Sequence, residues 1–143
     1  MLNSEKAEAI IVKQTPMDRA TVERVKKALA KKGVVLAQSE EIDRNLISRG
    51  IEAAVLDPGG IILMHTKVSA SGFFEELIHY GQIQSRRFDM ELSTEIIRME
   101  IEAQERLIKH QKIYHITDDE ITVLTENLEH YKMELEEKEI GGL

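Results

Sequence analysis

Cysteine is absent from this chain of 143 residues. Without thiols the chain can form no disulfide, and it can build no zinc site from thiolate ligands. Any metal site must therefore use imidazole and carboxylate groups, which the five histidines and 26 acidic residues supply.

Long apolar runs are absent too. No stretch approaches the ~20 consecutive apolar residues that span a bilayer. The first residues, MLNSEKAEAI, lack the basic segment followed by an apolar stretch that marks a secretory signal. We therefore expect no membrane partner and a cytoplasmic location, or else delivery by a route that needs no signal.

Positive charge is in short supply, with 19 Lys and Arg against 26 Asp and Glu and a formal net charge of −7. Phosphate contacts need concentrated Lys and Arg, and single-strand binding adds aromatic side chains among them. The lysines between residues 26 and 32 fit the solvated face of one helix instead. Nucleic acid is therefore not an expected partner.

The remaining composition is that of an ordinary globular protein, with 42% apolar and 31% charged residues. This length fits one core. We expect a single α+β domain over residues 1–143, with a sheet-containing half at 1–70 and a helical half at 71–140.

The first half alternates apolar runs with helical periodicity. We expect a helix at 15–33, where Thr15 can act as the cap and Pro16 suits the first helical position. A second, short helix with Ser39 as cap is expected at 39–50. The expected strands are 8–14, 34–38 and the two arms of a hairpin around the turn Asp57-Pro58-Gly59-Gly60.

The second half reads as helices only, at roughly 72–85, 92–115 and 117–139. Together with the small sheet they predict helices packed on one face. In the last helix, apolar residues recur at spacings of three and four: Ile121, Leu124, Leu128, Tyr131 and Leu135. This seam either docks on the preceding helices or forms a helix-mediated homodimer.

The stretch FFEELIHYGQ, residues 73–82, places three ionisable groups on one helix side. Glu75 and His79 are four residues apart and Glu76 is three from His79, so their side chains are neighbours. They point away from the expected core face, which includes Phe73, Leu77 and Gly81. They are either a solvated face or ligands for a metal ion.

Glu100 falls within the apolar arc of the next helix, which makes it anomalous. A carboxylate buried there must be protonated, pair with His79 or Arg98, or coordinate a cation. Three protein ligands with an open fourth position are typical of catalytic zinc. Glu75, His79 and Glu100 would supply them, and Glu76 would take a proton from the activated water. Gln104, one turn after Glu100, could orient a ligand.

These residues resemble a zincin metallopeptidase of the gluzincin type. There an H-E-x-x-H helix follows an edge strand, and a later helix brings a glutamate as the third ligand. EELIH occupies the motif position here, and MEIEAQ occupies the position of the glutamate helix. The chain also looks like small domains at the C-terminal ends of phage minor head proteins and toxin-like bacterial proteins. The resemblance implies a metal-dependent hydrolase, a peptidase or toxin-like effector, with a protein or peptide as substrate.

One departure from the pattern leaves alternatives open. Glu75 stands where the motif has its first histidine, and this harder ligand set suits Zn²⁺ less and admits Mn²⁺ or Fe²⁺. The extra negative charge would raise the pKa of bound water and blunt hydrolysis. The alternative function is thus a non-catalytic structural or protein-binding module, such as a phage head-associated one, without a metal. Glu102 could replace Glu100 as the third ligand.

The other histidines give weaker indications of a metal site. His65 ends a strand and could reach the same cleft, but a surface or satisfied core position is the commoner role. The span from Lys109 to His115 is expected to be the end of the glutamate-bearing helix.

Overall fold

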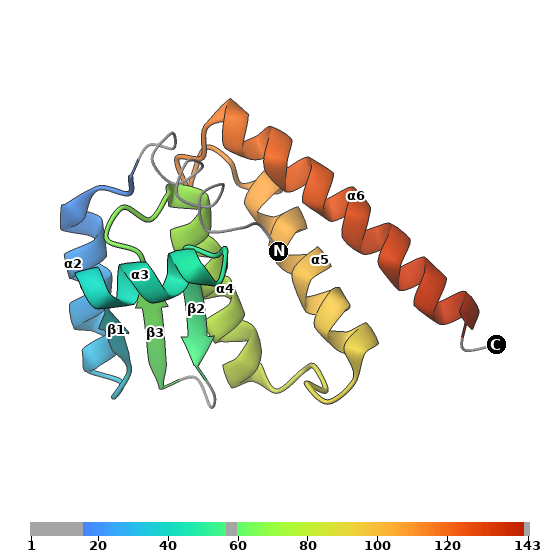
Figure 1. Ribbon diagram of the computed structural model, residues 1–143, viewed down its shortest axis with the longest axis horizontal. Coiled ribbons are helices and arrows are strands. Elements are labelled where there is room, and N and C mark those ends of the chain that lie inside the picture. The colour runs from blue at the N-terminus through green and yellow to red at the C-terminus, as the bar shows by residue number, and fades with distance from the viewer. Residues whose placement is uncertain (1–15, 57–59, 142–143) are drawn as a thin grey trace. The chain divides into compact units, whose positions relative to one another are not determined.

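A computed structural model describes residues 16–56 and 60–141. The expected strand at 8–14, the expected cap Thr15 and most of the predicted turn (residues 57–59) lie outside these residues. Within them the fold is mixed α+β, as predicted, with a small sheet and helices (Figure 1). By its internal contacts the chain divides into two compact units, Met1–Glu76 and Leu77–Leu143.

The sheet belongs to the first unit and has the strand order β1-β3-β2 in the described residues. Strands β2 (Ala53–Leu56) and β3 (Ile61–Met64) pair antiparallel, which confirms the predicted hairpin. Strand β1 (Val35–Ala37) pairs with β3 in parallel, so the later hairpin strand, rather than the earlier one, lies beside it. The partners Leu36 and Ile62 are fully buried and form the centre of this core.

Two helices cover this sheet, with α2 (Arg19–Ala30) packing on β1 and α3 (Glu40–Ser48) on β3 (Figure 1). Helix α3 begins as predicted, because Ser39 accepts a hydrogen bond from the backbone of Ile42. The predicted start of α2 was wrong. Asp18, not Thr15, is its N-cap, and Pro16 forms an isolated β-bridge instead of the first helical turn.

Helix α4 (Ala70–Ser85) begins over a buried polar cluster in the first unit. The carboxylate of Glu52 accepts hydrogen bonds from the backbone N and the hydroxyl of Ser69, at 2.9 and 2.6 Å. The Ser69 hydroxyl in turn accepts from the backbone N of Gly72 at 3.1 Å. Glu52 and Ser69 thus satisfy amide groups at the start of α4, where no intrahelical acceptor exists.

In the second unit, α5 (Ser93–Lys109) and α6 (Asp118–Gly141) pack along each other (Figure 1). Leu107 of α5 and Leu124 and Leu128 of α6 are buried. The apolar seam of α6 therefore docks on the preceding helix, one of its two predicted roles.

The predicted extension of α5 to residue 115 was wrong, because the helix ends at Lys109. Residues 110–115 form turns, with His115 in the left-handed region at φ 55°. The amide side chain of Gln111 donates to the backbone O of Ile116 and to Asp118, which closes this connection. No glycine or proline closely follows Lys109 in the sequence to signal the end of α5. The apolar periodicity continues beyond the helix, which explains the wrong prediction. Among the described residues, no helix has the length and apolarity needed to cross a membrane.

Candidate metal centre

Helices α4 and α5 bring together one imidazole and two carboxylates, from Glu75, His79 and Glu100. Each offers one ligand atom, and these atoms lie within 4.8 Å of one another. Glu75 and His79 are one helical turn apart on α4, which fixes their spacing. His79 Nε2 and Glu100 Oε1 are 3.4 Å apart.

These separations fit a divalent ion. Metal–ligand distances of about 2.0–2.2 Å at tetrahedral angles put neighbouring ligand atoms roughly 3.3–3.6 Å apart. The His79–Glu100 separation of 3.4 Å already matches this value. The Glu75 ligand atom lies within 4.8 Å of the other two. The group can hold a metal ion.

The side of α4 that carries His79 is not a solvated face. His79 is 8% exposed and Gln82 only 3%, while Glu75 and Glu76 are half-buried. Of the two predicted alternatives, the solvated face is therefore wrong for this side, and Gly81, expected on the core face, is exposed. Sequence periodicity assumes one buried side for a helix, whereas α4 is shielded on more than one.

Gln82 connects His79 to α5, a role that the sequence reasoning missed. Its Oε1 lies 2.8 Å from His79 Nδ1. Its Nε2 donates to the backbone O of Met99 at 3.0 Å and to Glu102 Oε1 at 3.2 Å. The available signal was the spacing of three between His79 and Gln82, which places both on one helix side.

Glu102 is held by a two-pronged contact with Arg87. The guanidinium donates to its two carboxylate oxygens, at 3.0 and 2.7 Å. This hydrogen bonding from Arg87 lowers the pKa of Glu102, against the opposing effect of partial burial. The same contact raises the pKa of Arg87. Glu102, the predicted alternative to Glu100 as third ligand, thus contacts Arg87 and Gln82.

The surroundings of Glu100 were partly anticipated. Glu100 is half-buried, and His79 is its neighbour, as expected. Arg98, the other expected partner, pairs instead with Glu95 and Glu139. Gln104, predicted to orient a ligand, lies one turn after Glu100 and is buried.

His65 is a satisfied core histidine of the first unit. It is 7% exposed, and its Nδ1 accepts a hydrogen bond from the backbone of Lys67 at 2.9 Å. Its Nε2 faces Asp43 at 3.8 Å. These contacts account for His65 without a ligand role.

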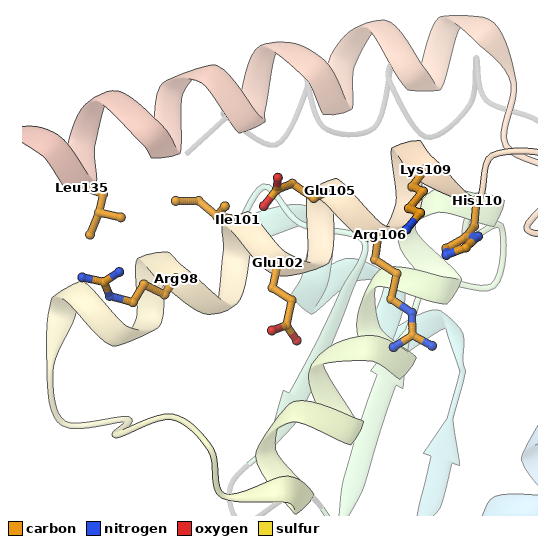
Figure 2. A pocket seen from close by; sticks show the side chains of 8 residues that line it. All are labelled: Arg98, Ile101, Glu102, Glu105, Arg106, Lys109, His110 and Leu135. Carbon is orange, nitrogen blue, oxygen red and sulfur yellow. The ribbon is translucent and has the colours of Figure 1, made fainter.

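A separate groove of about 580 Å³ runs along α5 and α6 in the second unit (Figure 2). Both signs of charge line it, together with apolar side chains: Arg98, Ile101, Glu102, Glu105, Arg106, Lys109, His110 and Leu135. None of the three candidate ligands is in this lining. Only Glu102 belongs both to the groove and to the hydrogen-bond chain that leads to His79.

Comparison with known proteins adds no relative: no protein-family model, curated protein or solved structure matches this chain.

Proposed function

We propose that this protein binds one divalent metal ion through Glu75, His79 and Glu100 and uses it for hydrolysis, as a zincin-like enzyme of the gluzincin type. The observation that carries the proposal is the convergence of one imidazole nitrogen and two carboxylate oxygens within 4.8 Å, from two helices. These are donor types that divalent ions prefer, and they lie close enough together to share one ion.

The donor set indicates which ions to test first. One nitrogen and two oxygens suit Zn²⁺, the usual ion with three protein ligands. Because two of the three donors are hard oxygens, Mn²⁺ and Fe²⁺ are the competing candidates. A divalent ion held there would supply Lewis-acid activation of water and of a substrate carbonyl.

Glu76 is the proposed general base. It follows Glu75 on α4 and is half-buried, which suits a carboxylate that must accept a proton away from bulk solvent. In peptide hydrolysis, water adds to the carbonyl carbon and Glu76 accepts its proton. Glu76 then gives that proton to the departing nitrogen as the C–N bond breaks. The substrate would be a protein or peptide, as for a peptidase or toxin-like effector.

The first experiment measures metal binding by the purified full chain. Calorimetric titration with Zn²⁺, Mn²⁺ and Fe²⁺ should give one ion per chain. Glu75→Gln, His79→Gln and Glu100→Gln should each weaken binding by more than the about 10–100-fold typical of a residue that only supports a ligand. Glu105→Gln is the matched control, because Glu105 is an exposed glutamate on the same helix as Glu100. A wild-type chain that takes up none of these ions contradicts the proposal.

The second experiment separates binding from catalysis. Glu76→Gln should keep metal affinity close to wild type and lower peptide hydrolysis by about 10²–10⁴-fold, the usual contribution of a general base. Mass spectrometry of a peptide library incubated with each variant would measure the loss. Equal cleavage by the wild type and Glu76→Gln would show that Glu76 is not the general base.

A second candidate function is a non-catalytic structural or protein-binding module, for example one associated with a phage head. The observation that favours it is Glu75 itself, since a carboxylate in place of an imidazole adds negative charge and disfavours ionisation of water. Glu75→His distinguishes the two functions. It should raise hydrolysis if that charge limits an enzyme, and it should leave a non-catalytic module without activity.

A further inference from the structure

The orientation of the Gln82 side chain is fixed by its surroundings. Its Nε2 lies 3.0 Å from the backbone O of Met99 and 3.2 Å from Glu102 Oε1, and both of these atoms can only accept. The opposite orientation would turn Oε1 toward two other oxygens and would be repulsive. Gln82 Oε1 must therefore face His79.

This orientation assigns the proton on His79. An amide oxygen only accepts hydrogen bonds, so His79 Nδ1, at 2.8 Å from Gln82 Oε1, must carry the hydrogen. In the neutral imidazole the lone pair then lies on Nε2. That atom is the one that faces Glu100, at 3.4 Å.

We propose that Gln82 is a positioning residue for the metal centre, and that Arg87 acts on the same centre through Glu102 and Gln82. Gln82 holds His79 in the Nδ1–H form, with the Nε2 lone pair directed at the point where Glu75 and Glu100 converge. The inference rests on the proposed metal site, but the Nδ1 proton that it assigns belongs to the metal-free protein as well.

The physical argument is one of preorganisation. A neutral imidazole has two tautomers, and only one of them presents Nε2 as a ligand. Metal-binding histidines commonly donate their other N–H to an oxygen, which fixes the ring and makes it a better donor to the metal. Gln82 supplies that oxygen from a buried position, where loose water cannot replace it.

Arg87 extends the chain of contacts to the surface. Its guanidinium donates two hydrogen bonds to the Glu102 carboxylate. These bonds fix the carboxylate, which also accepts a hydrogen bond from Gln82 Nε2. Arg87 is exposed, so it can be replaced with little effect on the core. Without it Glu102 gains rotational freedom, and Gln82 keeps only the Met99 carbonyl as a fixed acceptor.

The direct test is nitrogen NMR of the His79 ring in the metal-free full chain. The wild type should show a protonated Nδ1, as the Gln82 oxygen requires. Gln82→Met, which keeps the size of the side chain but offers no oxygen, should give a mixture of tautomers. Gln84→Met, at an exposed glutamine of the same helix, should leave the wild-type signals unchanged. A wild type without a proton on Nδ1, or a Gln82→Met variant with wild-type signals, overturns the inference.

Zn²⁺ titration supplies the second readout. Gln82→Met should weaken binding by about 10–100-fold, as expected for a group that orients a ligand. Arg87→Gln should weaken Zn²⁺ binding less, by up to about 10-fold. This exposed substitution also tests the inference if Gln82→Met does not fold. Arg86→Gln, an exposed arginine next in the chain, controls for the loss of charge and should bind as wild type.

The outcomes separate the two proposals. Unchanged affinity in both Gln82→Met and Arg87→Gln overturns the positioning role and leaves the metal site standing. A wild type that binds no ion overturns the proposed function, and the NMR signals then decide the role of Gln82 by themselves.

Discussion

At Gly72, the absence of a side chain decides how α4 can begin. A Cβ placed there would lie 1.9 Å from Glu52 Oε1, the atom that accepts the hydrogen bonds of Ser69. Any larger residue must push this carboxylate away from the start of the helix. Glycine at this position thus matters for the close approach of Glu52 and not for backbone conformation, because its backbone lies within an ordinary helix.

We expect Gly72→Ala to destabilise the fold by about 1–3 kcal/mol, the usual effect of overpacking a buried site. Gly81→Ala is the control on the same helix, because a Cβ there meets no atom within 4 Å. It should stabilise the protein by about 0.5–1 kcal/mol, since alanine is the better helix former. Urea denaturation measures both, and equal effects of the two substitutions would contradict this account of Gly72.

The Arg87–Glu102 contact gives stability a specific dependence on pH. The pKa of Glu102 is lowered in the folded state from an unfolded value of about 4.5. The stabilising contribution is therefore complete above that value and is lost as the pH falls through the lowered folded-state pKa. Because both side chains are substantially exposed, it amounts to no more than about 1 kcal/mol.

We accordingly expect Glu102→Gln to be less stable than wild type at pH 7, by up to about 1 kcal/mol. The difference should shrink as the pH falls from about 4.5 through the lowered pKa of the folded-state Glu102 carboxylate. Denaturation curves at several pH values, with a chelator present to exclude metal effects, would measure this. A difference that stays constant down to pH 3 would assign the effect to packing instead of charge.

At the scale of elements, α6 has a well-defined beginning. Thr117 Oγ1 accepts from the backbone N of Glu120 at 3.2 Å, and Glu120 Oε2 accepts from the backbone N of Thr117 at 2.9 Å. This reciprocal pair is a capping box, which satisfies two amides that the helix itself cannot. It fixes the point at which the chain turns from the α5 connection into α6.

Thr117→Ala should therefore cost about 1 kcal/mol of stability. Thr125→Ala is the matched control within the same helix, because its hydroxyl only bonds back to the backbone of Ile121 and lies exposed. That substitution should be neutral or slightly stabilising. The loss of helical circular dichroism with rising urea measures the stability of both variants. If Thr125→Ala proves less stable than Thr117→Ala, the capping role is excluded.

For the whole molecule, the proposed ion would link α4 to α5 and so couple ligand binding to stability. An ion bound only by the folded chain, present at 100 times its dissociation constant, adds about 2.7 kcal/mol. For a chain of this size that corresponds to a rise of roughly 5–10 °C in the melting temperature.

The metal-dependent rise should disappear in Glu100→Gln and remain in the control Glu105→Gln. Thermal unfolding followed with and without Zn²⁺ tests this, with a chelator added to show that the rise is reversible. If the melting temperature of the wild type is unchanged by Zn²⁺, Mn²⁺ and Fe²⁺, the result counts against a metal site in the folded state.

The sequence by itself determined the features that depend on neighbours in the chain. The hairpin follows from its turn residues, α3 from Ser39 and its apolar period, and the Glu75–His79 pairing from a spacing of four. Glu100 was recognisable because a carboxylate within an apolar stripe needs a partner. Each of these is decided within about two helical turns, where geometry is nearly fixed.

Only the tertiary structure decided the rest. The parallel pairing of β1 with β3, the use of Asp18 as the cap of α2, and the burial of Gln82 between His79 and Met99 all depend on segments distant in sequence. Helical periodicity predicts which residues share a side but not what covers that side. Whether an amide becomes a solvated group or a buried support for an imidazole is settled by its long-range neighbours, because the cost of burying a polar group depends on the partners that it finds there.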